Sequence, residues 1–339
     1  MEASDEESAT GPARPLGTDS ETDSAAAPAA IARDIDDETE ADLARLLDPD
    51  PKQPDPAALR SGMAPYLGDI DRYMRSLELE ESRRPRDDYM WTTQQDINPK
   101  MRAVLVDWLV EVACTFRLPA DTLHLAVSYV DRFLTTSVIK RHELQLLGVT
   151  ALLVAAKYED DIFVHEVQRY SAITANTYTR QQVVKMETDI LKSLNFEMGS
   201  PTARTFLRRY ITVCRGSDRA KAKKLEFLCS YLAELSLLDY DCIQFNPSIV
   251  AAACLFLARF TITPTARPWN LTLQRNTKYK VSDLKSCILM IHELQLNGTY
   301  PGLKVYVIKF KYNDRELEGV SAMASPENIP PRFLKDIKR

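Results

Sequence analysis

The chain has 339 residues, with 43 Lys and Arg against 48 Asp and Glu, which gives a formal net charge of −5. Residues 1–60 hold 16 acidic and 5 basic side chains, so an acidic segment precedes a mildly basic remainder. A basic surplus this small does not indicate a protein that binds nucleic acid directly, because such proteins more often show a concentrated basic stripe. The length is sufficient for two domains, each with a core of its own.

The spacing of the cysteines and the hydropathy of the chain argue against further classes of protein. The six cysteines are widely spaced and form no CxxC pair, so the sequence supports neither a zinc ribbon nor a redox dithiol. We expect buried, reduced thiols. No charged-then-apolar leader opens the sequence, and the uncharged run 144–156 is too short to span a bilayer. We therefore expect a soluble, intracellular protein without membrane contact.

The first hundred residues divide into two parts. Residues 1–62 are rich in Asp, Glu, Ser, Ala and Pro and poor in large apolar side chains, which predicts a disordered acidic region. Residues 63–98 are expected to hold a short amphipathic helix, from Tyr66 to Leu79, and a charged linker, Glu80–Asp88.

The stretch Met101–Phe116 predicts the central helix of the first bundle. Asn98 is a suitable N-cap and Pro99 a suitable first helical residue. Apolar side chains fall on opposite sides of this helix, so it needs packing partners on both sides.

The remaining helical signals predict two bundles of five helices each. Four helices follow in the first bundle (99–197), near 119–134, 141–158, 164–170 and 178–194. After Gly199-Ser200-Pro201, the second bundle (198–312) is expected to contain helices at 201–214, 218–238, 247–262, 281–296 and 302–312. Local similarity between VAAKYE (154–159) and FLARFT (256–261) suggests a duplicated unit. The tail, 313–339, is expected to pack loosely.

Motifs for catalysis are missing from the sequence. His142-Glu143 and His292-Glu293 begin like HExxH, but neither pair has the second histidine that a zinc peptidase needs. The chain also lacks GxSxG, GxxxxGK[ST] and GxGxxG. We expect no enzyme, no catalytic residue, no metal site and no cofactor, but a binding module built from apolar helical surfaces.

Two features have both a structural and a binding interpretation. Met101, Leu105 and Trp108 share a helix face bordered by Glu111, which could hold a peptide with apolar and basic side chains, although the pattern alone favours ordinary core residues. Lys157 follows a buried run, where the helix dipole alone favours a cation, and Glu187 is one charge among several on its helix.

Four motifs in order resemble the cyclin box of a mitotic-type cyclin. They are MRAVLVDWLVEV (101–112), SYVDRFL (128–134), LQLLGVTALLVAAKYE (144–159) and YTRQQVVKMETDILKSLNF (178–196). LVEV resembles the A type, and the amino-terminal region is similar to that of plant A3-like members. The resemblance implies an all-α fold of two tandem five-helix cyclin boxes.

For function, the resemblance implies a regulatory subunit that binds and activates a cyclin-dependent Ser/Thr kinase as a heterodimer and controls the cell cycle. It implies nuclear residence with a possible cytoplasmic pool. Lys157 and Glu187 would grip the regulatory helix of the kinase. The kinase-binding residues expected on this basis are Lys157, Glu187, Tyr158, Ile162, Phe163, Ile70 and Tyr66.

The resemblance also implies a docking patch for Arg-x-Leu peptides of substrates and inhibitors, in which Glu111 would meet the Arg and the apolar face the Leu. Arg102 and Asp131 would form an internal structural pair. The residues expected in the patch are Met101, Val104, Leu105, Trp108, Glu111, Arg141 and Gln145.

Departures and alternatives accompany this interpretation. The loop Asp160–His165 lacks the prolines usual in the family at this point, so kinase affinity or choice could differ. A TFIIB-like transcription factor built on the same helical unit is the main alternative, although the expected zinc ribbon and strongly basic face are missing. A helical scaffold protein that does not contact a kinase is a further alternative.

Overall fold

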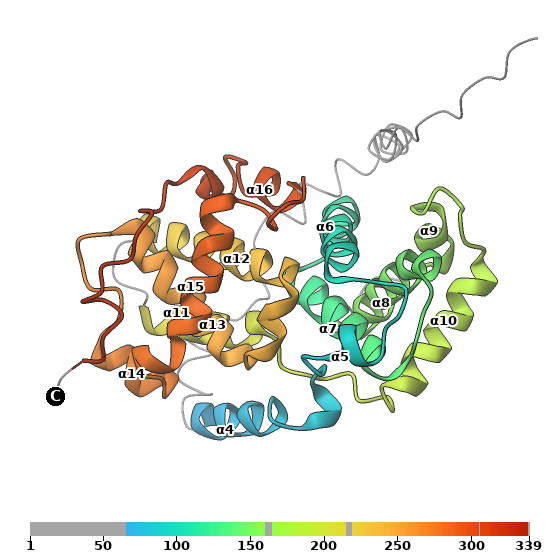
Figure 1. Cartoon of the computed structure of the whole chain (residues 1–339), viewed down its shortest axis with the longest axis horizontal. Helices are drawn as coiled ribbons and strands as arrows, with labels where there is room; N and C mark the ends of the chain where they lie inside the picture. Colours follow the sequence, from blue (N-terminus) through green and yellow to red (C-terminus); the bar gives the residue numbers. More distant parts are fainter. Residues whose placement is uncertain (1–65, 160–164, 215–218, 305, 338–339) are drawn as a thin grey trace, which may run out of the picture. The chain divides into compact units, whose positions relative to one another are not determined.

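The computed structural model describes residues 66–159, 165–214, 219–304 and 306–337 (Figure 1). The region 1–62, for which disorder is predicted, lies outside these residues. The described part of the chain consists of helices and connecting turns and contains no strand. The prediction of an all-α fold with two tandem five-helix units is confirmed.

The first bundle is built around one buried helix. Its helices are α6 (Pro99–Thr115), α7 (Ala120–Thr136), α8 (Leu144–Glu159), α9 (Val167–Ala172) and α10 (Arg180–Ser193), with a short 3-10 turn, η3 (Arg141–Glu143), before α8. Every residue from Leu146 to Ala156 is buried, as expected for a helix that is apolar on all sides. A Cβ at Gly148 would lie 2.6 Å from Leu105 Cδ1, so glycine allows α8 to approach α6 closely.

Helix α6 begins at the residue that the sequence predicts, and it contacts helices of both bundles. The Asn98 side chain accepts a hydrogen bond from the backbone N–H of Met101 at 3.0 Å, and Pro99 is the first helical residue. One side of α6 contacts α8, while other residues of α6 contact α12 and α16. These contacts explain why the sequence of α6 is apolar on opposite sides.

The second bundle repeats the arrangement around α13 (Pro247–Ile262), in which every residue from Val250 to Ala258 is buried. The surrounding helices are α11 (Ala203–Cys214), α12 (Arg219–Leu238), α14 (Leu271–Thr277) and α15 (Val281–Asn297), with a 3-10 turn, η4 (Tyr240–Gln244), before α13. Helix α14 was not predicted from the pattern. The helix predicted at 302–312 is shortened to α16 (Val307–Lys311), and Gly302 has a φ of +76° in the turn before it.

The prediction of a loosely packed tail was wrong. After the 3-10 turn η5 (Val320–Ala322), the tail follows the second bundle and buries Val320, Ile329 and Phe333. The Phe333 ring meets Phe260 of α13 edge to face, with 6.2 Å between ring centroids. Widely spaced apolar residues in an irregular segment fill grooves between helices without leaving a periodic signal.

The amino-terminal helix α4 (Leu67–Leu77) is anchored to the second bundle. Arg75 donates hydrogen bonds to the Tyr210 hydroxyl at 2.9 Å and to the carbonyl of Thr277 at 2.7 Å. The buried Glu78 accepts from the backbone N–H and the hydroxyl of Ser248, at 3.0 and 2.7 Å. A 3-10 turn, η2 (Glu81–Arg83), and the short α5 (Tyr89–Thr92) then connect α4 to α6.

Candidate functional site

Lys157 and Glu187 meet at the rim of the first bundle. Lys157 lies in the last turn of α8, and its Nζ is 2.7 Å from Oε1 of Glu187 on α10. The Lys157 side chain is 40% exposed and that of Glu187 is 16% exposed. The two charges, which are thirty positions apart in sequence, thus form one ion pair that is accessible to another molecule.

Two exposed apolar side chains lie close in sequence to this pair, on the same two helices. Tyr158 and Val184 are both exposed, and the Tyr158 hydroxyl lies where it would be 2.7 Å from a Cβ at Gly199. Val184 precedes Glu187 by one helical turn, so it shares the same face of α10. Val184 carries no sequence signal that would mark it as a contact residue. The predicted contact residues Ile162 and Phe163 lie outside the described residues.

Helix α4 has a second exposed apolar surface. Tyr66 and Tyr73 are exposed and Ile70 is half-buried, whereas Leu77 is buried and Met74 packs against the core. The sequence pattern combined these residues into a single apolar face. The anchoring by Arg75 leaves Met74 and Leu77 on the inner side of α4 and Tyr66, Ile70 and Tyr73 on the outer side. Tyr66 and Ile70 were predicted to contact the kinase, and Tyr73 joins them on this outer side.

The residues predicted for peptide docking differ in how far their side chains are exposed to solvent. Val104 is exposed on α6, Met101, Trp108 and Glu111 are half-buried, and Leu105 is buried beneath them against Gly148. The accessible apolar surface of this face of α6 therefore comes from Val104 and the partly covered Met101 and Trp108.

Two polar residues of the patch, Arg141 and Gln145, lie in η3 and in the first turn of α8. Arg141 is exposed, and its side chain donates to Asp96 at 2.9 and 2.7 Å. These bonds, with the backbone N–H of Arg141, lower the pKa of Asp96. Gln145 follows on the first turn of α8 and is half-buried. Arg141 is thus held by a carboxylate from the segment before α6.

Asp107 borders the docking residues and was missed by the sequence analysis. Its carboxylate accepts a hydrogen bond from the backbone N–H of Val307 at 3.1 Å, at the start of α16. Burial raises the pKa of Asp107 to about 6, against the lowering effect of backbone hydrogen bonds from the α16 start. Asp107 therefore places α16 of the second bundle beside the exposed side of α6.

Arg102 and Asp131 form a buried pair inside the first bundle. The guanidinium donates to both Asp131 oxygens at 2.7 Å, and the Tyr89 hydroxyl donates to Asp131 at 2.8 Å. The two side chains are 2% and 5% exposed. Arg102 also donates to the carbonyl of Leu237 at 2.8 Å, so this network joins α6, α7 and the end of α12.

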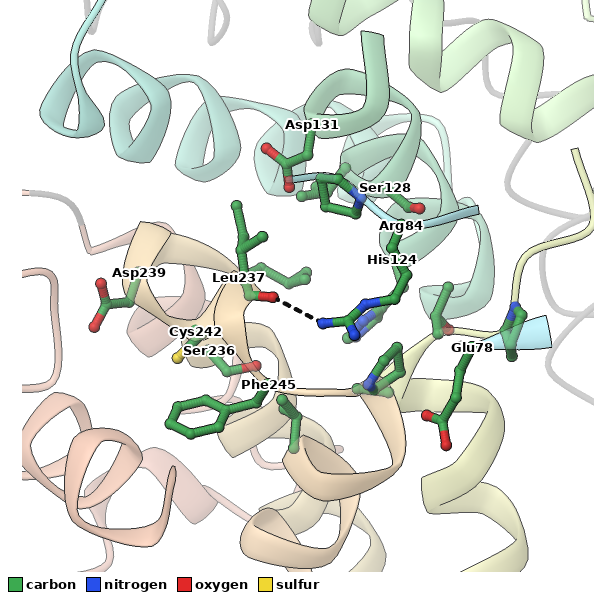
Figure 2. A pocket seen from close by; sticks show the side chains of 18 of the residues that line it. Glu78, Arg84, His124, Ser128, Asp131, Ser236, Leu237, Asp239, Cys242 and Phe245 are labelled. Carbon is green, nitrogen blue, oxygen red and sulfur yellow. Dashed lines mark hydrogen bonds between the residues drawn. The ribbon is translucent and has the colours of Figure 1, made fainter. Parts of the chain in front are cut away.

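A pocket of about 120 Å³ lies among the first bundle, the second bundle and the segment between α4 and α5. We call it the inter-bundle pocket. Figure 2 shows side chains from all three parts at this pocket, among them Arg84, His124 and Phe245. It is distinct from the face that carries Lys157 and Glu187, because neither residue lines it.

Metal sites and membrane-spanning helices are both missing from the residues that the structure describes. No group of three or more His, Cys, Asp or Glu side chains in this part of the chain is arranged to hold a metal ion. Among the helices described, none has the length and hydropathy needed to cross a membrane.

The domain architecture decides the family. Residues 69–199 match the N-terminal domain of cyclins, and residues 201–326 match the C-terminal domain of cyclins. The chain belongs to the cyclin family. Its two bundles are therefore two cyclin domains, and α4 lies at the beginning of the first matched region.

Relatives identify this cyclin as A-type and plant-like. It is 49% identical to Cyclin-A3-1 of rice (Oryza sativa subsp. japonica) over 274 residues, which cover 81% of this chain and 73% of the rice protein. It is 47% identical to Putative cyclin-A3-1 of Arabidopsis thaliana over 273 residues, 80% of this chain and 76% of that protein. The carrot (Daucus carota) G2/mitotic-specific cyclin C13-1 is 46% identical, over 80% and 79% of the two chains.

A solved structure shows the same fold. A viral cyclin from herpesvirus saimiri superimposes with a TM-score of 0.57 at 20% sequence identity, covering 65% of this chain and 95% of the viral one. Cyclins are regulatory subunits and not enzymes themselves, so a regulatory role in the cell cycle follows from the family. The relatives do not support the alternative of a TFIIB-like transcription factor.

Proposed function

We propose that this cyclin binds and activates a cyclin-dependent Ser/Thr kinase as a heterodimer, with the Lys157–Glu187 pair as the centre of the contact. The single observation that carries the proposal is the exposed ion pair between these residues at 2.7 Å. Tyr158 and Val184 beside it and Tyr66, Ile70 and Tyr73 on α4 supply apolar contact area.

The chemistry of the pair suits free backbone groups at one end of a partner helix. An ammonium group has three donors, and Lys157 uses one of them for Glu187. The remaining donors can reach carbonyls that have no partner at a helix end, while Glu187 Oε2, which accepts no hydrogen bond from any described residue, can accept from free N–H groups. A helix held in this way would orient the catalytic glutamate of the kinase toward its ATP-binding lysine.

The test uses the full chain and a purified cyclin-dependent kinase. We expect Lys157→Ala with Glu187→Ala to abolish most binding and histone phosphorylation. Lys185→Ala with Asp189→Ala is the matched control, because it removes one charge of each sign from α10 and leaves the pair intact. Equal kinase activation by the wild type and the pair variant would refute the proposal.

Substrate docking is the second part of the proposal. The exposed Val104 and half-buried Trp108, with Glu111 at their border, can receive a peptide that presents an apolar and a basic side chain, as in Arg-x-Leu. We expect Trp108→Ala to raise KM for Arg-x-Leu substrates while the activity toward a short peptide without the motif stays unchanged. Because Trp108→Ala could disturb folding, Val104→Ser tests the same surface at an exposed position. An unchanged KM for Val104→Ser in a complex with normal basal activity would argue against docking here.

Nuclear residence, with a cytoplasmic pool, is the proposed location and rests on family membership. A fluorescent fusion observed through the cell cycle tests it, and exclusion from the nucleus at every stage would refute it.

A further inference from the structure

The chain carries its own copies of the peptide motif that the docking patch is proposed to receive. An arginine and a leucine stand two positions apart at six places: 14–16, 45–47, 75–77, 132–134, 315–317 and 332–334. The last four belong to the described residues, and the fold uses each of their leucines. Leu77 and Leu134 are buried, and Leu317 and Leu334 pack against the core. These four copies therefore cannot act as docking peptides without local unfolding.

The other two copies lie in the acidic region before α4, outside the described residues, and they differ in the residues that flank them. Arg45-Leu46-Leu47 is followed directly by Asp48, and Arg45 is the only basic residue from 34 to 50, where eight residues are acidic. Arg14-Pro15-Leu16 is followed by glycine and threonine. The copy at 45–47 thus presents, in order, a positive charge, an apolar side chain and a negative charge.

The docking patch presents complementary groups in the matching order along α6. Lys100, Val104 and Trp108 follow one another at intervals of four residues and so share one face of the helix, with Glu111 at its border. Lys100 and Val104 are exposed, and Trp108 and Glu111 are half-buried. Lys100 and Glu111 are about 16 Å apart along the helix axis. An extended peptide from Arg45 to Asp48 spans about 10 Å between its end Cα atoms, and the long side chains bridge the rest.

The linker between this copy and α4 is long enough to reach the docking patch. Residues 48–66 separate Leu47 from Leu67, the first residue of α4, and a linker of this length extends to about 65 Å. A compact body of the size of residues 66–337 has a diameter of about 50 Å. Arg14-Pro15-Leu16 has the longer linker, and closing a longer loop costs more entropy. Charge and linker length therefore both favour the copy at 45–47.

We propose that residues 45–48 bind to the docking patch of their own chain and compete there with Arg-x-Leu substrates. The paired groups are Arg45 with Glu111, Leu47 with Val104, and Asp48 with Lys100. The inference rests on the proposed docking function of this surface and concerns its regulation. Because the segment is tethered, its local concentration is of the order of 1 mM, so a weak contact is enough to occupy the patch. A substrate must displace the segment, which weakens its apparent affinity.

The experiment measures binding of a fluorescein-labelled peptide, with Arg-Ala-Leu between glycine and serine residues, to the full chain by fluorescence anisotropy. Arg45→Ala with Leu47→Ala should bind this probe about tenfold more tightly than the wild type does, as expected for a segment with a Kd of roughly 0.1 mM at a local concentration of about 1 mM. Asp48→Lys should tighten probe binding by about two- to threefold, because it places a like charge beside Lys100.

Leu59→Ala with Arg60→Ala is the matched control, because it removes one leucine and one arginine from the same region without the Arg-x-Leu spacing. It should bind the probe like the wild type. Equal affinity of the wild type and the Arg45 and Leu47 variant for the probe would overturn the inference and leave the docking proposal standing. Failure of both proteins to bind the probe would refute docking itself.

Two further outcomes would overturn the assignment to residues 45–48 of the same chain. A gain in affinity on Arg14→Ala with Leu16→Ala, and none on the Arg45 and Leu47 variant, would identify the other copy as the competitor. The gain should also be the same at low and high cyclin concentration, because the segment belongs to the chain that it occupies. A gain that grows with cyclin concentration would show that a second molecule supplies the segment.

Discussion

Two of the ion pairs among the described residues of the first cyclin domain have opposite surroundings. Arg102 and Asp131 are almost completely buried, and Tyr89 and the carbonyl of Leu237 complete their hydrogen bonding. Lys157 and Glu187 are joined by a single hydrogen bond at a partly exposed rim. The first network has its hydrogen-bond partners inside the molecule, whereas the second has donors and an acceptor oxygen that no described residue uses.

This contrast explains why the two pairs should respond differently to mutation. Removing one member of a buried pair leaves an uncompensated charge in a medium of low polarity, which is costly. Removing one member of an exposed pair changes stability little, because water replaces the lost partner. Burial therefore separates a pair that holds the fold from a pair that can bind a partner.

The largest effect is expected for the buried pair. Asp131→Asn leaves Arg102 without a counter-charge and should lower the free energy of unfolding by about 3–5 kcal/mol, measured by urea denaturation. Arg141→Gln is the control, because it removes an arginine from the exposed pair with Asp96 and should leave the denaturation midpoint unchanged. Equal midpoints for Asp131→Asn and the wild type would contradict a stabilising role for the network.

A charge swap tests the exposed pair. Lys157→Glu combined with Glu187→Lys restores an ion pair of reversed polarity, so the free energy of unfolding should change by less than about 1 kcal/mol. Kinase affinity should fall by about 100-fold, because the free backbone groups at the contacted end of the partner helix would then face the wrong charges. Isothermal titration calorimetry with the kinase measures this. A swapped protein that binds the kinase normally would show that the pair acts only within the cyclin.

His124 extends the comparison to a buried group that has no counter-charge and stays neutral. Its pKa is about 3 in the folded protein and about 6.5 when exposed, so between these pH values only the unfolded state binds the proton. Stability is therefore lost as the pH falls below 6.5, by about 2 kcal/mol at pH 5. His124→Phe should lack this loss when urea denaturation is compared at pH 7.5 and pH 5. A similar pH dependence in both proteins would show that other groups cause it.

The sequence was informative wherever the deciding signals are local. Asn98 and Pro99 mark the start of α6, and the unbroken apolar run marks α8 as the buried centre of its bundle. Proximity of Lys157 and Glu187 came from the resemblance to cyclins, since the residues alone gave two unremarkable charges. The resemblance to the family thus supplied a spatial contact that the residue pattern alone did not predict.

Features that depend on distant segments could not be predicted. Asp107 caps a helix 200 positions further along the chain, and the inter-bundle pocket collects side chains from three separate parts. The buried tail residue Phe333 has no periodic neighbours that would mark it as core. Such positions are decided by tertiary packing, for which a single sequence has no local signal.

Helix α4 offers the smallest and most local version of the same comparison. Arg75 faces the second bundle and is bonded to Tyr210 and Thr277, whereas Tyr73 faces outward and is exposed. Tyr73→Ser should leave the free energy of unfolding unchanged and weaken kinase binding by about fivefold, because it removes aromatic contact area of about 1 kcal/mol. Arg75→Met should have the opposite effects. It should lower the free energy of unfolding, because it loosens α4 from the bundle, and it should change kinase binding little. If Tyr73→Ser destabilised the isolated cyclin and left kinase affinity intact, the outer face of α4 would be part of the fold and not of the interface.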